Sequence, residues 1–164
     1  MTIARRTRVA AYAICLRDGE VLLTRFVSRD GTDRHWTLPG GGIEYGEDPS
    51  HGVVREVAEE TGYRAEVEAL LGVDSRPRRQ GWTGHEEDVH HLGVFYAVRI
   101  VGGVLRHEVD GSTDQAAWVA LADVPGLRRA SLVDVGLRLE RERPSSGHVD
   151  SELGDTVLPG QGPE

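Results

Sequence analysis

The stretch GGIEYGEDPSHGVVREVAEETGY, residues 41–63, decides how this sequence folds. Asp48 followed by Pro49 favours the start of a helix, because Asp caps free backbone N–H groups and Pro tolerates the first helical position. Gly62 favours the end of that helix, because glycine readily adopts a positive φ angle. The stretch therefore predicts one helix over residues 49–61, entered from a glycine-rich segment.

Acidic side chains gather on one face of this predicted helix. Glu56, Glu59 and Glu60 are three or four positions apart, so they converge on the same face. Three neighbouring carboxylates repel one another unless a cation neutralises them, and oxygen ligands suit Mg²⁺ and Mn²⁺. Val53 and Val57 lie on the opposite side, which predicts that the helix packs through them and presents its acids outward.

The residues ahead of the helix complete a possible catalytic set. Gly40, Gly41 and Gly42 allow close approach of the backbone to a ligand. Glu47 can fold back to pair with Arg55. Pyrophosphate hydrolysis needs neutralised phosphoryl oxygens, an activated water and backbone close to the phosphates, and these residues supply those parts. The alternative is that the acidic run is only a solvated helix face.

The spacing resembles a motif of a known family. Five residues separate Gly41 from Glu47 and seven more separate Glu47 from Arg55, which opens the run REVAEETGY. This pattern is similar to the Nudix box of the Nudix hydrolases. The last position departs from it, because the family prefers an aliphatic residue where this chain has Tyr63. The likeness extends over residues 8–143.

The resemblance implies an α/β fold, an α/β/α sandwich with a mixed β-sheet and the box as a loop, helix, loop motif. It implies that Glu56, Glu59 and Glu60 hold Mg²⁺ or Mn²⁺, with the backbone carbonyl of Gly40 as a further ligand. Glu47 would hold Arg55, and Arg55 would orient the glutamates. By this resemblance the catalytic candidates are Glu56, Glu59 and Arg55, with either glutamate as the general base.

The implied reaction is cleavage of a pyrophosphate bond in a nucleoside diphosphate linked to another moiety. Nucleotide sugars, ADP-ribose-like compounds and (d)NTPs are all candidate substrates. A second function stays open at this point, a non-catalytic nucleotide-sensing or partner-binding module on the same fold. The resemblance also makes a homodimer a possibility.

A polar segment from Asp74 to Asp88 is expected to form a loop that binds substrate. Its arginines can clamp phosphate and its tryptophan can stack on a base or sugar. The candidate substrate-binding residues are Arg76, Arg78, Arg79, Trp82, Glu86 and Glu87. An acid among Glu86, Glu87 and Asp88 is a second candidate for the general base.

Turn and helix signals outline the remaining chain. Asp18 and Gly19 predict a tight turn between strands over residues 9–16 and 21–25. Ser131 can cap a second helix that runs to about Arg143. Residues 144–164 are rich in Ser, Gly, Pro and acids, so we expect a domain over residues 1–143 and a flexible acidic C-terminal tail.

Composition limits the protein class. The 164 residues suit one soluble domain, and the net charge of −8 disfavours a nucleic-acid partner. No apolar run is long enough for a membrane span, and no leader pattern is recognisable, so we expect a cytoplasmic protein. Cys15 is the single cysteine, which excludes an internal disulfide and a thiolate metal site.

Overall fold

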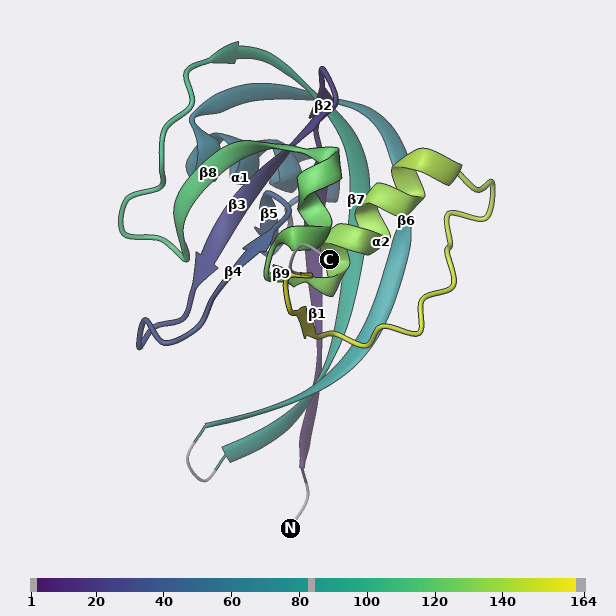
Figure 1. Cartoon of the computed structure of the whole chain (residues 1–164). Helices are drawn as coiled ribbons and strands as arrows, with labels where there is room; N and C mark the ends of the chain where they lie inside the picture. The colour runs from purple at the N-terminus through teal and green to yellow at the C-terminus, as the bar shows by residue number, and fades with distance from the viewer. Residues whose placement is uncertain (1–2, 83–84, 162–164) are drawn as a thin grey trace.

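The computed structural model describes residues 3–82 and 85–161, which form two β-sheets, two α-helices and one 3₁₀ helix (Figure 1). The strands are β1 (Ala4–Ile14), β2 (Leu16–Arg17), β3 (Glu20–Val27), β4 (Arg34–Thr37), β5 (Gly40–Gly42), β6 (Tyr63–Trp82), β7 (His85–Gly103), β8 (Thr113–Ala120), β9 (Arg129–Ala130) and β10 (Val157–Leu158). The helices are α1 (Pro49–Thr61), η1 (Leu121–Gly126) and α2 (Ser131–Glu142).

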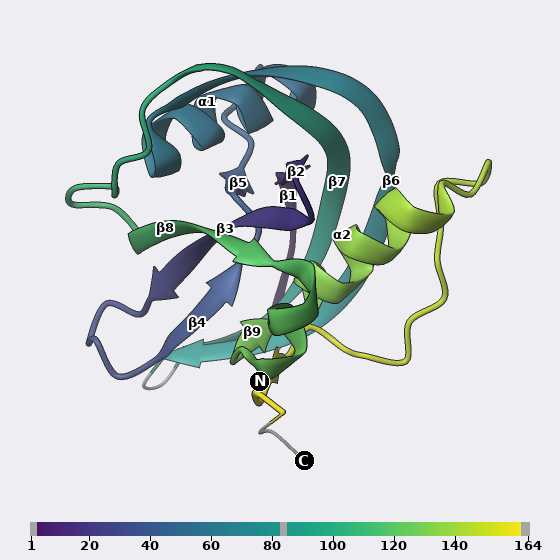
Figure 2. The ribbon, with the colours of Figure 1, turned by 45° about the horizontal axis from the view of Figure 1, so that its top comes forward.

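The strands pair in both directions, as the mixed-sheet prediction requires. One sheet has the order β5-β1-β7-β6, in which β1 is parallel to β7 and antiparallel to β5. The other has the order β10-β9-β4-β3-β2, with β8 also paired to β3. Figure 2 shows β6 and β7 arching past α1 while β3, β4 and β8 lie below them.

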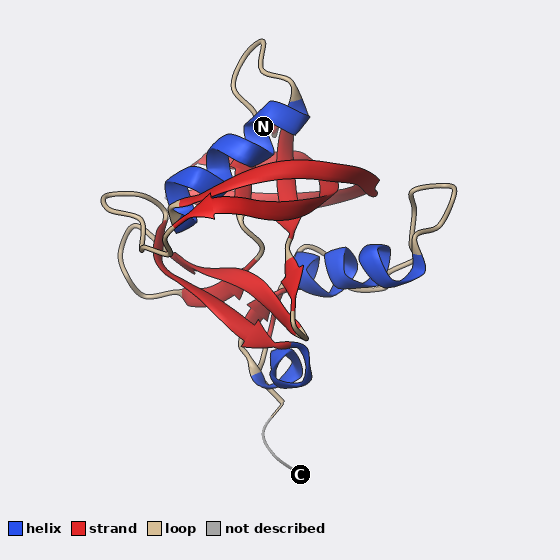
Figure 3. Cartoon of the chain, turned by 90° about the horizontal axis from the view of Figure 1, so that it is seen from above, coloured by secondary structure: helices blue, strands red, loops and turns tan. Residues whose placement is uncertain are grey.

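Each face of the strands packs against a different helix. Alternate residues of a strand point to opposite faces. In β1, Ala11 and Ala13 therefore reach the core that holds Val53 and Val57 of α1, whereas Ile14 reaches the core that holds Leu139 of α2. Figure 3 shows the two helices on different sides of the strands. The predicted α/β/α sandwich is confirmed.

The tight turn at Asp18 and Gly19 forms as predicted, but the hairpin around it is short. Both residues have positive φ angles, 51° and 78°, as a two-residue hairpin turn requires. Only Leu16 and Arg17 pair with β3 across this turn. The body of β1 instead pairs with β5 and β7, because the chain passes from one sheet to the other near Cys15.

The expectation of a loop over residues 74–88 is wrong, since the described residues of this range, 74–82 and 85–88, belong to β6 and β7. The two strands pair from Tyr63 and Gly103 to Trp82 and His85. The paired ends of these two strands form a two-stranded ribbon that projects at the lower left of Figure 1. Its polar composition reflects cross-strand pairing of charges, such as Arg79 Nε donating to Asp88 Oδ1 at 2.9 Å.

The two helices begin differently. The Asp48 side chain accepts a hydrogen bond from Ser50 N, Pro49 opens α1, and Gly62 ends it with a φ angle of 77°, all as predicted. Ser131 does not cap α2, because it is the first helical residue and Ala130 precedes it without a side-chain cap. The Ser131 hydroxyl binds the C-terminal segment instead, donating to Gly154 O at 2.8 Å.

The segment after α2 lies against the domain, whereas the sequence predicts a flexible tail over residues 144–164. Val149 is buried in the α2 core, and Val73 N donates to Gly147 O at 2.9 Å. β10 pairs with β9, which places residues 157–158 at the edge of the second sheet. These contacts depend on partners distant in sequence, so local composition did not reveal them.

Neither α1 nor α2 combines the length and apolarity that a helix needs to cross a membrane, and the same is true of η1 within the described residues.

Candidate active site

Glu60 is buried between α1 and β5, the glycine strand formed by Gly40–Gly42. Its side chain is only 3% exposed, and its Oε2 accepts from Gly40 N at 3.0 Å and from Thr24 Oγ1 at 3.5 Å. Burial raises the pKa of Glu60 well above its ordinary value, and the charges of Glu56 and Glu108 raise it further. The expectation that all acids of the helix face outward is therefore wrong for Glu60.

Glu56 lies next to Gly41, where the absence of a side chain leaves room for its carboxylate. A Cβ atom at position 41 would stand 2.7 Å from Glu56 Oε1. The backbone of Gly40 has a φ angle of 148°, and a Cβ there would stand 2.2 Å from Ala11 O. A side chain at position 41 would therefore displace the Glu56 carboxylate, and one at position 40 would clash with the backbone of β1. Burial raises the pKa of Glu56, against the opposing effect of Arg55.

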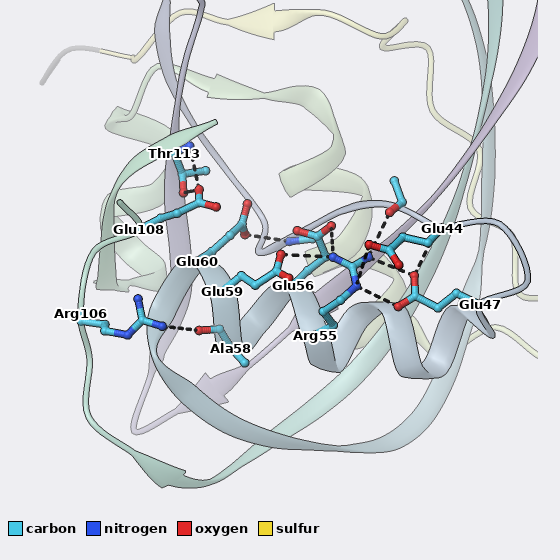
Figure 4. A network of polar contacts seen from close by, with 12 residues as sticks. Glu44, Glu47, Arg55, Glu56, Ala58, Glu59, Glu60, Arg106, Glu108 and Thr113 are labelled. Carbon is cyan, nitrogen blue, oxygen red and sulfur yellow. Dashed lines mark hydrogen bonds and ion pairs between the residues drawn. The ribbon is translucent and has the colours of Figure 1, made fainter. Parts of the chain in front are cut away.

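Arg55 joins the acids of this region into one network (Figure 4). Its guanidinium donates to both Glu47 oxygens, from Nε at 2.8 Å and from Nη2 at 3.0 Å. Nη1 donates to Glu56 at 3.1 Å and Glu59 at 3.2 Å, and Nη2 reaches Gly42 O at 3.3 Å. The forked contact lowers the pKa of Glu47 to about 2. Arg55 thus holds Glu56 and Glu59 in place from the side, as the predicted support role requires.

The carboxylates offer the oxygen ligands that Mg²⁺ prefers, although they do not form a closed cage. Glu56 and Glu60 line one cavity, whereas Glu59 is half-exposed and turned toward Arg55. Across the part of the chain that the structure describes, no three His, Cys, Asp or Glu side chains are already gathered for a metal ion. A cation fits the donor set here, because it would offset the burial of Glu60 and the repulsion within the cluster.

The cavity measures about 440 Å³ and connects the acids with cationic side chains. Glu56, Glu60 and Gly40 line one part of it, and Arg8 and Arg78 line other parts. A volume of this size suits a small-molecule ligand. The cavity can therefore hold a phosphorylated compound with its phosphates between carboxylates that bind a cation and arginines that bind anions.

Of the predicted substrate-binding residues, the structure brings Arg78 to this cavity. Arg76 is buried and donates to Gly154 O and Ser131 Oγ, so it holds the C-terminal segment. Arg79 pairs with Asp88 and Glu87 with Arg6 on the projecting ribbon. Glu86 is exposed, and none of the acids at positions 86–88 lines the cavity of Glu56 and Glu60. The Trp82 side chain lies outside the part that the structure describes.

Comparison with known proteins identifies the family. The model of the NUDIX domain matches residues 4–135, which is most of the chain. This chain belongs to the Nudix family. A MutT-like protein from Streptomyces ambofaciens is 48% identical over 149 residues, which cover 91% of this chain and 85% of the relative. An ADP-ribose pyrophosphatase from Methanocaldococcus jannaschii is 32% identical over 119 residues, or 73% of this chain and 65% of that protein.

Solved structures show the same fold. A NUDIX hydrolase from Nitrosomonas europaea superposes with a TM-score of 0.69 at 24% identity, covering 83% of this chain and 89% of the other. Some curated relatives are much longer than this Nudix domain, which spans 34% and 29% of the length of two of them.

Tyr63, the position where this Nudix domain departs from the box, serves packing. It is buried, and its hydroxyl accepts from Trp118 Nε1 at 3.0 Å. The two rings lie 6.2 Å apart. The larger residue therefore replaces an aliphatic contact with a tyrosine–tryptophan pair behind α1.

Sequence reasoning missed two charged residues of this Nudix domain. Glu108 lies between β7 and β8 and points toward Glu60 in Figure 4, held by Thr113, whose Oγ1 donates to it at 2.6 Å. Arg8 of β1 lines the cavity beside Gly42, where an added Cβ would meet its Nη2 at 3.2 Å. Neither residue carries a local motif, so only strand pairing reveals them.

Proposed function

We propose that this Nudix domain is a divalent-metal-dependent hydrolase that cleaves a pyrophosphate bond in a nucleoside diphosphate linked to another moiety. The observation that carries this proposal is the meeting of Glu56 and Glu60 with the glycine strand in one cavity, with Arg55 supporting the carboxylates. Mg²⁺ is the expected ion and Mn²⁺ a substitute, held by Glu56, Glu59 and Glu60, with the Gly40 carbonyl as a further ligand. A divalent ion, when bound, neutralises phosphoryl oxygens and promotes ionisation of the attacking water.

The side chains of this site divide the chemical work. Arg8 binds phosphoryl oxygens, and Glu47 keeps Arg55 oriented so that Glu56 and Glu59 stay in place. A water oxygen attacks one phosphorus of the P–O–P bridge. A new P–O bond forms as the bridging bond breaks, the leaving phosphate keeps the bonding electrons, and the water proton passes to a carboxylate.

Glu56 is our first candidate for the carboxylate that takes this proton. It lines the cavity, and its burial raises its pKa toward the range in which a carboxylate is an effective base. Glu59 and Glu108 are the other candidates for the general base. Glu108 takes the place of the acids at positions 86–88 as a candidate, because those acids do not line the cavity. Glu56→Gln, Glu59→Gln and Glu108→Gln variants separate them, because only loss of the base removes the acidic limb of the pH–rate profile.

The names of relatives point to more than one substrate. One is the ADP-ribose pyrophosphatase described above, and a Homo sapiens relative, 36% identical over 113 residues, is named 8-oxo-dGDP phosphatase NUDT18. Both names refer to purine nucleoside diphosphate compounds. We therefore place ADP-ribose and purine nucleotides first in a substrate panel, followed by nucleotide sugars.

The decisive experiment compares the wild type with Glu60→Gln in Mg²⁺ over this panel, with products identified by phosphorus NMR. We expect cleavage by the wild type and a loss of at least about a hundredfold in the variant. Glu142→Gln on α2 is the matched control and should cleave normally. Mg²⁺ should also raise the Tm of the wild type and not that of Glu60→Gln.

A nucleotide-sensing module without catalysis is the rival function. It needs no carboxylate cluster, so the presence of Glu56, Glu59 and Glu60 favours the enzyme. Ligand binding without cleavage of any compound, while Mg²⁺ still raises the Tm, would decide for the sensor.

A further inference from the structure

The C-terminal segment supplies a residue to the wall of the cavity. Asp155 lines the same cavity as Glu56 and Glu60. The match to the Nudix model ends at residue 135, so Asp155 lies beyond the matched residues. Its side chain is 24% exposed, which leaves it accessible from the cavity.

Hydrogen bonds on both sides of Asp155 fix its position. On one side, Arg76 Nη1 donates to Gly154 O at 2.7 Å, and Ser131 Oγ donates to the same carbonyl at 2.8 Å. On the other, Ser131 N donates to Thr156 O at 2.8 Å. The strand β10 follows directly. Asp155 is therefore held by the start of α2 and by a buried arginine of β6, which pre-organises its carboxylate.

Unpaired polar atoms surround this carboxylate. A second cavity of about 40 Å³ is lined by Asp155, Arg76 and His91, among others, and it shares Tyr12, His91, Leu132 and Asp155 with the main cavity. Arg76 is 8% exposed, and among the described residues its Nη2 and the Nε2 of His91 are buried without a hydrogen-bond partner. Buried polar atoms are normally satisfied, so these two atoms point to a further polar partner, a ligand or water, near the smaller cavity.

The charged groups that line the cavity suit different parts of a ligand. Glu56 and Glu60 with a cation, together with Arg8, suit phosphates. A phosphate placed against Asp155 would be repelled, so this carboxylate suits a neutral group with N–H or O–H donors. Phe26 and His35, whose ring centroids lie 5.0 Å apart, also line the cavity and offer an aromatic surface.

We propose that Asp155 is a specificity-determining residue that accepts hydrogen bonds from the organic moiety of the substrate, through its held position on the cavity wall beside Arg78 and His91. The donors are the N–H edge of a purine or the hydroxyls of a ribose. This inference rests on the proposed function, because it assigns the contacts of the organic part of the substrate that the acids would cleave.

Binding without metal tests this assignment separately from catalysis. Isothermal titration calorimetry in EDTA would compare GMP, AMP, ribose 5-phosphate and pyrophosphate against the wild type and Asp155→Asn. A hydrogen bond to a charged group is worth about 1.5–3 kcal/mol, so we expect the variant to bind at least one organic probe about tenfold to a hundredfold more weakly. Pyrophosphate should bind as well as before or more tightly, because Arg78 loses its partner, 3.6 Å away.

Two controls accompany this experiment. Glu152→Gln removes a charge from an exposed position of the same segment and should change no affinity. Asp155→Glu keeps the charge and should retain part of the affinity. A weaker affinity for GMP and AMP alone identifies the purine edge as the donor, whereas an equal loss for ribose 5-phosphate identifies the hydroxyls.

Several outcomes would overturn the proposal. These are wild-type affinities in Asp155→Asn, failure of the wild type to bind any organic probe, or a loss of pyrophosphate affinity as large as that of GMP. For a cleaved substrate, the proposal requires a raised KM with little change in kcat. Absence of all cleavage in the wild type would remove the proposed function, while the affinities would still decide whether Asp155 contacts the ligand.

Discussion

At the scale of single residues, Glu60 carries an electrostatic cost that pH can reveal. Its pKa is raised in the folded chain, so the folded state keeps a proton that the unfolded state loses above about pH 4.5. The stability of the wild type without metal should therefore fall as pH rises through the raised pKa. Glu60→Gln removes this cost, so its Tm in EDTA should exceed that of the wild type at pH 8 and approach it near pH 4.5.

Glu142→Gln provides a control of opposite sign for this effect. Arg138 lowers the pKa of Glu142, so this carboxylate stabilises the folded state above its ordinary pKa, and its loss should lower the Tm slightly at pH 8. A lower Tm of Glu60→Gln at pH 8 would instead show that the Glu60 carboxylate is a stabilising part of the structure.

Arg55 acts by shape as well as charge. The Nε and Nη2 atoms of its planar guanidinium donate to the two oxygens of Glu47, while Nη1 donates to Glu56 and Glu59. The single ammonium group of lysine cannot make all these contacts. Arg55→Lys should lower kcat about tenfold to a hundredfold, as for other residues that support metal ligands. Arg138→Lys is the matched control, since Arg138 also pairs with a glutamate on a helix. Equal kcat in the wild type and Arg55→Lys would refute the support role.

At the scale of elements, the end of α1 depends on Gly62. Its φ angle is 77°, and a Cβ would stand 2.5 Å from Val104 O. Gly62→Ala should therefore cost about 1–3 kcal/mol of unfolding free energy, measured by urea denaturation. Gly19→Ala is the control, because Gly19 has a similar φ angle of 78° with nothing within 4 Å of the added Cβ. If both variants lost the same stability, the backbone angle alone and not the contact with residues 104–106 would limit this position.

At the scale of the whole molecule, the C-terminal segment joins elements distant in sequence. Deleting residues 144–164 would remove Val149 from the core around α2 and expose the side chains that it covers. It would also remove two carbonyl partners of Arg76. A buried valine alone contributes about 1.5–3 kcal/mol, so the Tm should fall by about 5 °C or more, measured by circular dichroism. An unchanged Tm would show that the segment is the flexible tail that its composition predicts.

The sequence by itself determined the local structure around the acidic helix. Capping and glycine signals placed α1 at residues 49–61, and the position of Glu47 just ahead of the helix let it fold back onto Arg55. These features depend on residues at most eight positions apart. The resemblance carried by the same stretch also predicted the α/β/α sandwich.

Only the tertiary structure decided which side chains meet in the cavity. Glu60 is buried by Gly40 and Thr24, 20 and 36 positions away, whereas helical spacing predicted an outward acid. Glu108 and Asp155 reach the site through the pairing of β8 and β10, and Arg76 holds the C-terminal segment and does not line the cavity of Glu56 and Glu60. The physical reason is range: capping and periodicity act within a few turns of the chain, whereas burial and charge pairing depend on which strands the fold brings together.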